Sequence, residues 1–215
     1  MFTGLISEIG EVKNARPQGG GRRILVSAPI TATDCEIGDS IAIDGVCLTV
    51  VETRNEVIGF DVSEETTQNT TLKHLRAGEK LNVESALRAG DRFGGHFMQG
   101  HVDTTGSITT IRGPEGGREG VLEVELPHSS RMFLVSKGSI AVDGISLTIQ
   151  SISGNSFMSI IVPHTYRATI LQYKRSGSLV NIEFDMIVKT LHGMLPGVIE
   201  GVEELTFDKL RKWGY

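Results

Sequence analysis

Short runs of alternating apolar and polar residues dominate the pattern along this 215-residue chain. Ile41-Ala42-Ile43 is followed by the turn dipeptide Asp44-Gly45 and then by the β-rich run 46–51, which is typical of two strands joined by a tight turn. Turn signals recur along the chain at 19–21, 38–39, 55–56, 113–114, 116–117 and 154–155. Short strand-like runs with recurring turn signals predict an antiparallel all-β architecture of small barrels or sandwiches.

An internal repeat sets the domain organisation. Residues 41–50 read IAIDGVCLTV and residues 140–149 read IAVDGISLTI, with six identical positions and three exchanges between aliphatic residues. The offset of 99 residues recurs for 78–84 against 177–183, and an offset of 96 aligns Gly4 with Gly100. A period this long indicates one duplicated domain, not a solenoid. We therefore expect domains at 1–92 and 98–188, joined by the short linker 93–97.

Helical segments are expected to be few. One short helix per module is predicted at 67–75 and 166–173, since a Thr precedes each and a Gly follows it. The tail, 189–215, has no counterpart in the first module and is predicted to be helical, with a break at Pro196-Gly197 and a restart over 203–213. An apolar appendage of this kind docks either on a partner subunit or on its own barrel.

Composition narrows the function classes. A net charge of −5 without a basic stripe argues against nucleic acid and anionic membrane as partners. No apolar run is long enough to span a membrane, and the first residues do not resemble a signal peptide, so the cytoplasm is the expected compartment. Two cysteines, Cys35 and Cys47, are too few for a disulfide framework or a zinc site.

Differences between the copies point to chemistry. The second module carries His101 in place of Leu5, Ser146 in place of Cys47 and Asp185 in place of Ala86, and it also has His164. It thus gains imidazoles, a hydroxyl and a carboxylate, which are groups suited to proton transfer. His96 adds another imidazole just before the second module.

Other features have a simpler structural interpretation. The shared Asp-Gly pairs are first of all turns, whereas Thr49 and Thr148 are expected on the sheet face opposite a core Leu, where they could meet a ligand. The shared Asn82 and Glu84, with their counterparts Asn181 and Glu183, are either edge polar residues or ligand-binding groups.

Two rival chemistries are weakly supported. A metal site is not expected, because His96 and His101 would lie on opposite faces of an extended segment and few ligands lie nearby. A serine hydrolase is disfavoured because Ser146 lacks the Gly-x-Ser-x-Gly elbow.

These segments resemble a known family. The opening 1–6, the segment from Gly94-Gly95-His96 to Gly100-His101-Val102, and Asp143-Gly144-Ile145-Ser146-Leu147-Thr148 are similar to riboflavin synthase signatures, and the resemblance covers roughly 1–190. It implies two tandem six-stranded antiparallel Greek-key barrels with a C-terminal helical segment that helps assemble a homotrimer. It also implies dismutation of two 6,7-dimethyl-8-ribityllumazine molecules, without a cofactor, to riboflavin and 5-amino-6-(ribitylamino)pyrimidinedione. An association with lumazine synthase is left open.

The resemblance also assigns site residues, with one lumazine bound in each barrel. The active site would form between the first barrel of one subunit and the second barrel of another, with Lys137 reaching across from a neighbouring chain. The first-barrel site is expected to comprise Gly4, Leu5, Ile6, Cys47, Leu48, Thr49, Asp61, Val62, Ser63, Glu64, Glu65 and Thr66. The second-barrel site is expected to comprise Gly100, His101, Val102, Ser146, Leu147, Thr148, Val162, Pro163, His164, Thr165, Tyr166 and Arg167.

Catalytic roles follow from the chemistry of the side chains. His101 is the expected general acid/base, and Ser146 with Thr148 would polarise the acceptor ring. Asp185 would orient or relay protons, Cys47 would contact the ligand without acting as a nucleophile, and Phe2 would pack against a substrate.

Two other functions compete with this one. A non-catalytic lumazine- or flavin-binding chromoprotein would share the doubled fold, but such binders lack the Gly-Gly-His and Gly-His pair that this chain keeps. A nicotinamide-dependent reductase would need a Gly-x-Gly-x-x-Gly segment after a strand, and the chain has none.

Overall fold

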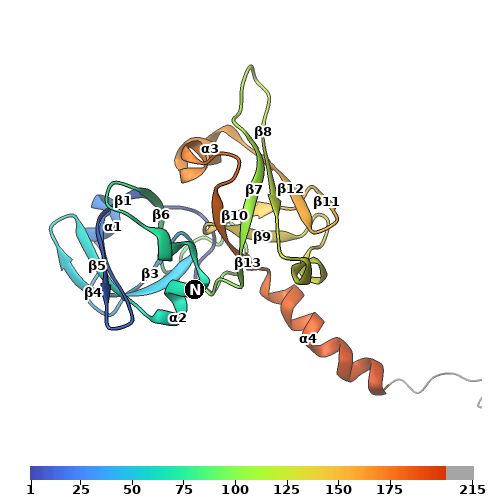
Figure 1. Cartoon of the computed structure of the whole chain (residues 1–215), viewed down its shortest axis with the longest axis horizontal. Helices are drawn as coiled ribbons and strands as arrows, with labels where there is room; N and C mark the ends of the chain where they lie inside the picture. The colour runs from blue at the N-terminus through green and yellow to red at the C-terminus, as the bar shows by residue number, and fades with distance from the viewer. Residues whose placement is uncertain (202–215) are drawn as a thin grey trace, which may run out of the picture. The chain divides into compact units, whose positions relative to one another are not determined.

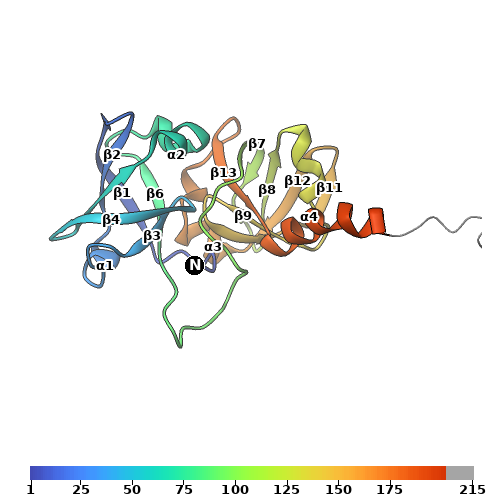
Figure 2. The ribbon, with the colours of Figure 1, turned by 90° about the horizontal axis from the view of Figure 1, so that it is seen from below.

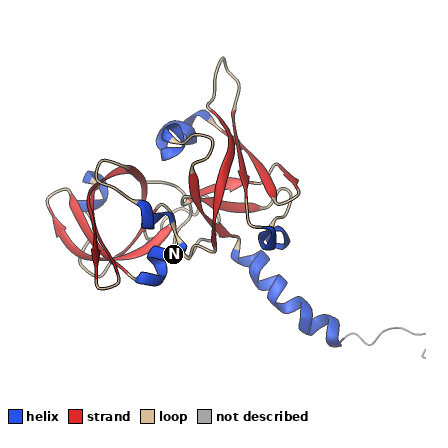
Figure 3. Cartoon of the chain, in the orientation of Figure 1, coloured by secondary structure: helices blue, strands red, loops and turns tan. Residues whose placement is uncertain are grey.

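The computed structural model describes residues 1–201, and its helices and strands follow the duplication (Figure 1). Met1–Asp185 form one compact unit, and the chain from Met186 onward belongs to a second. Strands predominate, with a few short helices between them (Figure 3).

The first barrel closes from six antiparallel strands in the order β1-β2-β5-β4-β3-β6. Its elements are β1 (Glu8–Gln18), β2 (Gly21–Ser27), α1 (Pro29–Ala32), β3 (Ser40–Ile43), β4 (Val46–Arg54), β5 (Val57–Val62), α2 (Glu64–Asn69), the 3₁₀ helix η1 (Thr71–His74) and β6 (Lys80–Ser85). The predicted turn joins β3 to β4, and Asp44 and Gly45 have positive φ angles of 46° and 78°, as a two-residue hairpin turn requires.

The second half repeats this order but does not close. Its elements are β7 (Thr104–Arg112), β8 (Gly120–Glu125), η2 (His128–Phe133), β9 (Ser139–Val142), β10 (Ile145–Thr148), β11 (Ser151–Ser153), β12 (Ser156–Ile161), α3 (Pro163–Ala168), η3 (Ile170–Tyr173) and β13 (Leu179–Phe184). They form a seven-stranded curled sheet in the order β10-β9-β13-β7-β8-β12-β11.

The second half therefore has seven strands where six were expected. By the 99-residue offset, β10 and β11 together correspond to β4, and they form the two ends of the open sheet. In the first barrel β4 continues past a register shift between Val50 and Glu52, whereas in the second half the ladder is interrupted at Ile149 and Gln150. The half-barrel is thus the same topology with one strand divided.

The helices begin earlier than predicted. Each expected single helix is an α-helix followed by a 3₁₀ helix, α2 with η1 and α3 with η3. Ser63 caps α2 by accepting a hydrogen bond from the Thr66 N–H, and Pro163 begins α3 at a position where its missing N–H is not needed. Thr70 and Thr169 are extended and separate the two helices of each pair.

The predicted break at Pro196-Gly197 is also wrong. Helix α4 (Met186–Gly201) continues through both residues. A proline removes one N–H donor and crowds the preceding turn, a cost that a helix can accommodate when the flanking turns are intact. The predicted restart over 203–213 lies outside the described residues.

Each barrel has its own apolar core, and a small third cluster lies between them. This cluster comprises Phe2, Ala42, Met98 and Ala141, with Phe2 and Met98 joined by an isolated antiparallel bridge. Between β6 and β7 the chain forms no strand longer than this one-residue bridge. Figure 2 shows this connecting segment as the green loop. The two modules are therefore held together by packing as well as by a covalent connection.

Candidate functional site

The segments that open the two modules are exchanged between the barrels. The Cys47 N–H of the first barrel donates to the Gly100 carbonyl at 2.8 Å, and the Ser146 N–H of the second donates to the Gly4 carbonyl at 3.1 Å. Ile6 packs against the second core and Val102 against the first.

The grouping expected from the sequence is therefore wrong. Gly4–Ile6 belongs with Ser146, and Gly100–Val102 belongs with Cys47. The sequence order had placed each segment with the barrel that it precedes. The observed pairing arises because each segment crosses to the free edge at the start of β4 or β10 in the opposite barrel.

Two buried carboxylates hold these segments in place. Glu84 accepts hydrogen bonds from the N–H groups of Thr3 and Gly4, at 2.8 Å and 3.1 Å. Glu183 accepts the equivalent bonds from Gln99 and Gly100, at 2.7 Å and 3.0 Å. Burial raises the pKa of Glu84 above its ordinary value, and the N–H groups oppose that shift.

Glu84 and Glu183 therefore bind backbone N–H groups of the opening segments, a role that was not among those expected from the sequence. Glycine is needed where the held segments meet the barrels. A Cβ on Gly4 would lie 2.5 Å from the Ser146 nitrogen, and one on Gly100 would lie 2.5 Å from the Cys47 Cβ. Both glycines also have positive φ angles, 79° and 78°.

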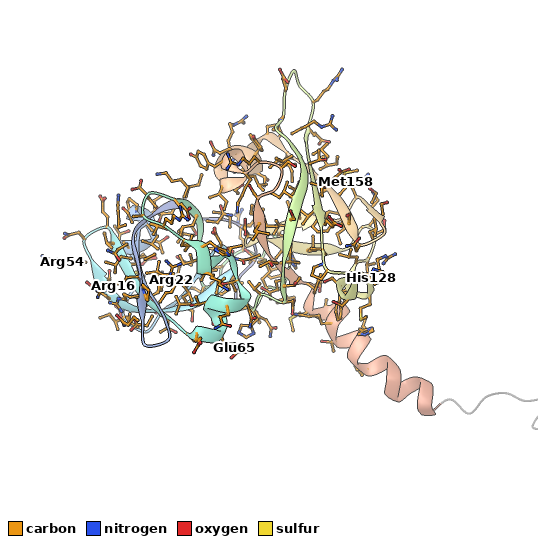
Figure 4. All side chains as sticks on the ribbon, viewed as in Figure 1. Arg16, Arg22, Arg54, Glu65, His128 and Met158 are labelled. Carbon is orange, nitrogen blue, oxygen red and sulfur yellow. The ribbon has the colours of Figure 1, made fainter. Side chains whose placement is uncertain are left out.

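A pocket of about 300 Å³ opens on the first barrel. It is lined by Val46, Cys47, Glu65, Thr66, Asn69, Thr70, Gly100, His101 and Val102. His101 is exposed and Cys47 is half-buried. The pocket thus joins an imidazole, a thiol and the hydroxyl of Thr66, and Figure 4 shows Glu65 projecting from α2.

Three lining residues, Val46, Asn69 and Thr70, were not expected from the sequence. Val46 directly precedes the expected Cys47. Asn69 ends α2 and Thr70 follows it, three and four positions after Thr66, a spacing that places side chains on one face of a helix. This periodicity is the signal that could have identified Asn69 and Thr70.

The remaining predicted residues of the first barrel have local partners. Asp61 pairs with Arg23 at 2.9 Å, Val62 is buried in the core, Ser63 caps α2, and Glu64 accepts a hydrogen bond from Gln68. Leu48 is buried and Thr49 is exposed, so the expected alternation of faces along β4 is confirmed.

Ser146 of the second barrel has a histidine partner. Its Oγ lies 2.7 Å from Nδ1 of His96, whose residue is only 7% exposed. Burial lowers the pKa of His96, and the charge of Asp185 acts in the opposite direction. Within residues 1–201, Nε2 of His96 is buried and has no hydrogen-bond partner.

The two neighbouring histidines therefore serve different barrels. His96 binds Ser146, whereas His101 lines the pocket at Cys47. The sequence drew attention to His96 without including it among the candidate residues. Its hydrogen bond to Ser146 spans 50 positions, which no local pattern reveals.

The other candidate residues of the second barrel lie on β10, directly after β13 and around α3. Leu147 is buried and Thr148 is exposed on β10, as their counterparts are on β4. Asp185 is half-buried and follows β13. The residues Val162, Pro163, His164 and Arg167 are exposed, and Thr165 and Tyr166 are half-buried, at and around α3.

Lys137 is exposed at a turn before β9. It has a positive φ angle of 65°, and its Nζ donates to Oε1 of Gln150 at 2.6 Å. Among the residues described, no group of three or more His, Cys, Asp or Glu side chains is arranged to hold a metal ion. No described helix is long and apolar enough to cross a membrane.

Comparison with known proteins gives three consistent results. The lumazine binding domain family matches the chain twice, at residues 3–86 and 99–185. The riboflavin synthase of Bacillus subtilis (strain 168) is 39% identical over 209 residues, which cover 97% of this chain and 96% of that protein. The riboflavin synthase of Actinobacillus pleuropneumoniae is 35% identical over 217 residues, covering 100% of both.

Among solved structures, the crystal structure of LumP complexed with riboflavin superposes with a TM-score of 0.79 at 24% identity. It covers 86% of this chain and 99% of LumP. The complex of LumP with 6,7-dimethyl-8-(1'-D-ribityl) lumazine gives a TM-score of 0.77 at 24% identity. At this level of identity the likeness supports the fold alone.

Proposed function

Because this chain belongs to the riboflavin synthase family, we propose that its two barrels each bind one molecule of 6,7-dimethyl-8-ribityllumazine, one beside Cys47 and one beside Ser146. The enzyme is a transferase that moves a four-carbon unit from one lumazine to the other. The products are riboflavin and 5-amino-6-(ribitylamino)pyrimidinedione.

One observation supports this proposal most strongly. In both barrels an exchanged segment bonds to the same strand position, to Cys47 through Gly100 and to Ser146 through Gly4. A reaction between two identical molecules needs two related binding sites. Holding both reactants in place can supply on the order of 7–11 kcal/mol of the barrier reduction.

The proposed binding regions are the duplicated domains 1–92 and 98–188. In the first barrel the ligand would contact Cys47–Thr49, Asp61–Thr66 and the exchanged segment Gly100–Val102. In the second it would contact Ser146–Thr148, Val162–Arg167 and the exchanged segment Gly4–Ile6. The hydrogen bonds and core contacts of the exchanged segments support this regrouping.

The proposed chemistry uses few side chains. His101, exposed at the first-barrel pocket, would move a proton to or from the C7 methyl group of one lumazine. In the second barrel, Ser146 and Thr148 would donate hydrogen bonds that polarise the acceptor ring, with His96 fixing the Ser146 hydroxyl. Asp185 would orient or relay protons, and Cys47 would contact the ligand without forming a covalent bond to it.

We further propose that three copies assemble into a homotrimer, with each active site shared between the first barrel of one subunit and the second barrel of another. Ile187, Leu191 and Met194 of α4 are 57%, 58% and 60% exposed and recur at helical spacing. Such a stripe favours helix association. Lys137 would reach the site of a neighbouring subunit. The cytoplasm is the proposed compartment, and lumazine synthase is the partner to test by co-purification.

Mixing two inactive variants tests the shared site. His101→Gln damages the first-barrel pocket, and Ser146→Ala damages the second. If the site forms between subunits, mixed oligomers contain intact sites and recover riboflavin formation, which is measured by absorbance. If each chain carries its own complete site, the mixture stays as inactive as the separate variants, and the shared-site proposal fails.

A direct assay separates catalysis from binding alone. The purified unmodified chain should convert the lumazine to riboflavin. A chromoprotein would bind the lumazine and leave it unchanged.

A further inference from the structure

A second pocket, of about 480 Å³, lies between the two barrels and shares no lining residue with the pocket at Cys47. Both modules contribute to it, through the segments around η1 and β6 and around η3 and β13. Its lining includes Asp44, Leu75, Glu79, Lys80, Tyr173 and Lys174. The catalytic proposal uses none of these residues.

Two buried carboxylates are equivalent in the duplicated fold. Asp44 and Asp143 are 3% and 0% exposed, and their turns touch at Gly45 and Gly144. Oδ1 of Asp44 accepts a hydrogen bond from the Asn82 N–H, and Oδ1 of Asp143 accepts one from the Asn181 N–H, both at 2.7 Å. Up to this point the two environments match.

The environments of Asp44 and Asp143 differ in the counter-ion of the carboxylate. Nζ of Lys174 lies 2.7 Å from Oδ2 of Asp143. The residue equivalent to Lys174 in the first module is Leu75, and both donate their N–H to the carbonyl three residues earlier. Asp44 consequently has no ammonium equivalent to that of Lys174 from its own module, and its side chain lines the pocket.

The local charges leave this carboxylate uncompensated. The carboxyl groups of Asp44, Asp143 and Glu79 lie near the single ammonium of Lys174, whose positive charge opposes their negative charges. Lys80 also lines the pocket, but its Nζ pairs with Glu11 at 2.8 Å. His74 and Tyr173 are the other titratable groups in the lining.

The missing counter-ion also affects the pKa of Asp44. Burial, together with the neighbouring Asp143, raises the pKa of Asp44 to about 8, while Lys174 lowers it. The raised pKa favours the protonated form of Asp44 near neutral pH.

We propose that this pocket binds a small primary ammonium ion, R–NH₃⁺, against Asp44, in the way that Lys174 places its own ammonium against Asp143. An ammonium is compact and carries three donors, so it can bond to a buried carboxylate oxygen. The pocket of about 480 Å³ leaves room for a short organic substituent.

Proton competition gives the site a pH signature. The ligand binds the ionised carboxylate, and alkylammonium ions keep their proton up to a pH of about 10. Because the pKa of Asp44 is about 8, the affinity for ethylammonium should rise about tenfold between pH 7 and pH 9. Binding at pH 7 should release protons.

The test uses the full chain and titration calorimetry at constant ionic strength, with ethylammonium chloride as the probe. Tetramethylammonium chloride and potassium chloride are the comparison salts, because neither cation can donate a hydrogen bond. We expect saturable binding of ethylammonium alone. Absence of saturable binding at pH 9, or equal binding of the comparison cations, overturns the proposal.

Two variants locate the site. Asp44→Asn keeps the Oδ1 acceptor for Asn82 and suits the positive φ angle of 46°, so the fold is expected to persist while ethylammonium binding is lost. Leu75→Lys supplies an internal ammonium and should also abolish binding. Glu36→Gln, an exposed change outside the pocket, should bind as the unmodified chain does.

Unchanged binding by Asp44→Asn would refute the assignment even if Leu75→Lys failed to fold. Riboflavin formation plays no part in these measurements. Their outcome is therefore independent of the proposed catalytic function.

Discussion

Asn82 and Asn181 join the two barrels by reciprocal bonds. Nδ2 of Asn82 donates to the Asp143 carbonyl at 2.8 Å, and Nδ2 of Asn181 donates to the Asp44 carbonyl at 2.9 Å. Each amide oxygen also accepts a backbone N–H from the opposite module, from Ile170 and Thr71 respectively. Both asparagines are buried. The shared asparagines thus bind the partner barrel, a role that was not among those expected from the sequence.

Asn181→Ala tests this relationship. It should lower the free energy of unfolding by on the order of 2–3 kcal/mol, because it leaves the Thr71 N–H and the Asp44 carbonyl without partners. Urea unfolding at neutral pH measures the change. Asn14→Ala, at an exposed position, should stay within about 0.5 kcal/mol of the unmodified chain. Similar stabilities for the two variants would show that the bridge contributes little.

Gly45→Ala should be more damaging than its backbone angle alone explains. Its Cβ would lie 2.6 Å from the Gly144 nitrogen, so the methyl group collides with the opposite barrel as well as straining the turn. Gly78→Ala is the matched control, since Gly78 has a φ angle of 91° and no atom lies within 4 Å of the place its methyl group would take. We expect Gly78→Ala to cost about 1–2 kcal/mol, as strain does, and Gly45→Ala clearly more. Thermal unfolding of both variants checks the difference; equal losses would contradict the collision.

Glu84→Gln should loosen the segment that Glu84 holds. A carboxylate accepts at both oxygens, whereas the amide presents a donor to the N–H groups of Thr3 and Gly4. The amide hydrogens of these residues should then exchange faster with deuterium, while those of the first-barrel core stay protected. Glu183→Gln is the matched variant and should act on Gln99 and Gly100 instead. An identical exchange pattern in both variants would argue against specific anchoring.

His101→Gln should reduce the turnover number by roughly 10²–10⁴-fold, the usual contribution of a general acid or base, while the lumazine dissociation constant changes little. Steady-state kinetics and fluorescence titration measure the two quantities. His128→Gln is the control, at an exposed histidine of η2 that is labelled in Figure 4, and it should leave both unchanged. Parallel losses of binding and turnover would reject the acid/base role.

Cys47→Ser should keep turnover within about tenfold of the unmodified enzyme, because the second barrel carries a serine, Ser146, at the same position and no covalent step is assigned to the thiol. Mass spectrometry during turnover should find no adduct on Cys47. Cys35→Ser, a half-buried position beside the first core, controls for the loss of a thiol. Complete loss of activity, together with an adduct in the unmodified chain, would contradict this assignment.

The sequence predicted the repeated features well. The Asp44-Gly45 turn and its flanking strands follow from local preferences, and the repeat carries them to Asp143-Gly144. Thr49 and Leu48 face opposite ways because strand geometry requires it. The lumazine-binding repeat itself is confirmed by the family match.

Features that depend on long-range pairing were not predictable in the same way. Local sequence does not reveal that Gly4 bonds to Ser146 rather than to Cys47, because both sites offer equivalent strand edges. The contact of His96 with Ser146 depends on that same crossing. The counterpart of β4 is likewise divided into β10 and β11 at Ile149 and Gln150. The residue types at these two positions suit a strand as well as those of β4 do, so local preference does not predict the division.

The exchange of opening segments makes the two halves mutually dependent. Each half carries a segment that bonds to the opposite barrel, so a chain cut between residues 86 and 99 would yield two fragments that each lack this contact. If the proposed binding sites are correct, only reassociation of the fragments would complete both of them. Complementation between such fragments would therefore be all-or-none. A single-barrel ancestor could have formed the same sites only as a dimer in which the two chains exchanged their N-terminal segments.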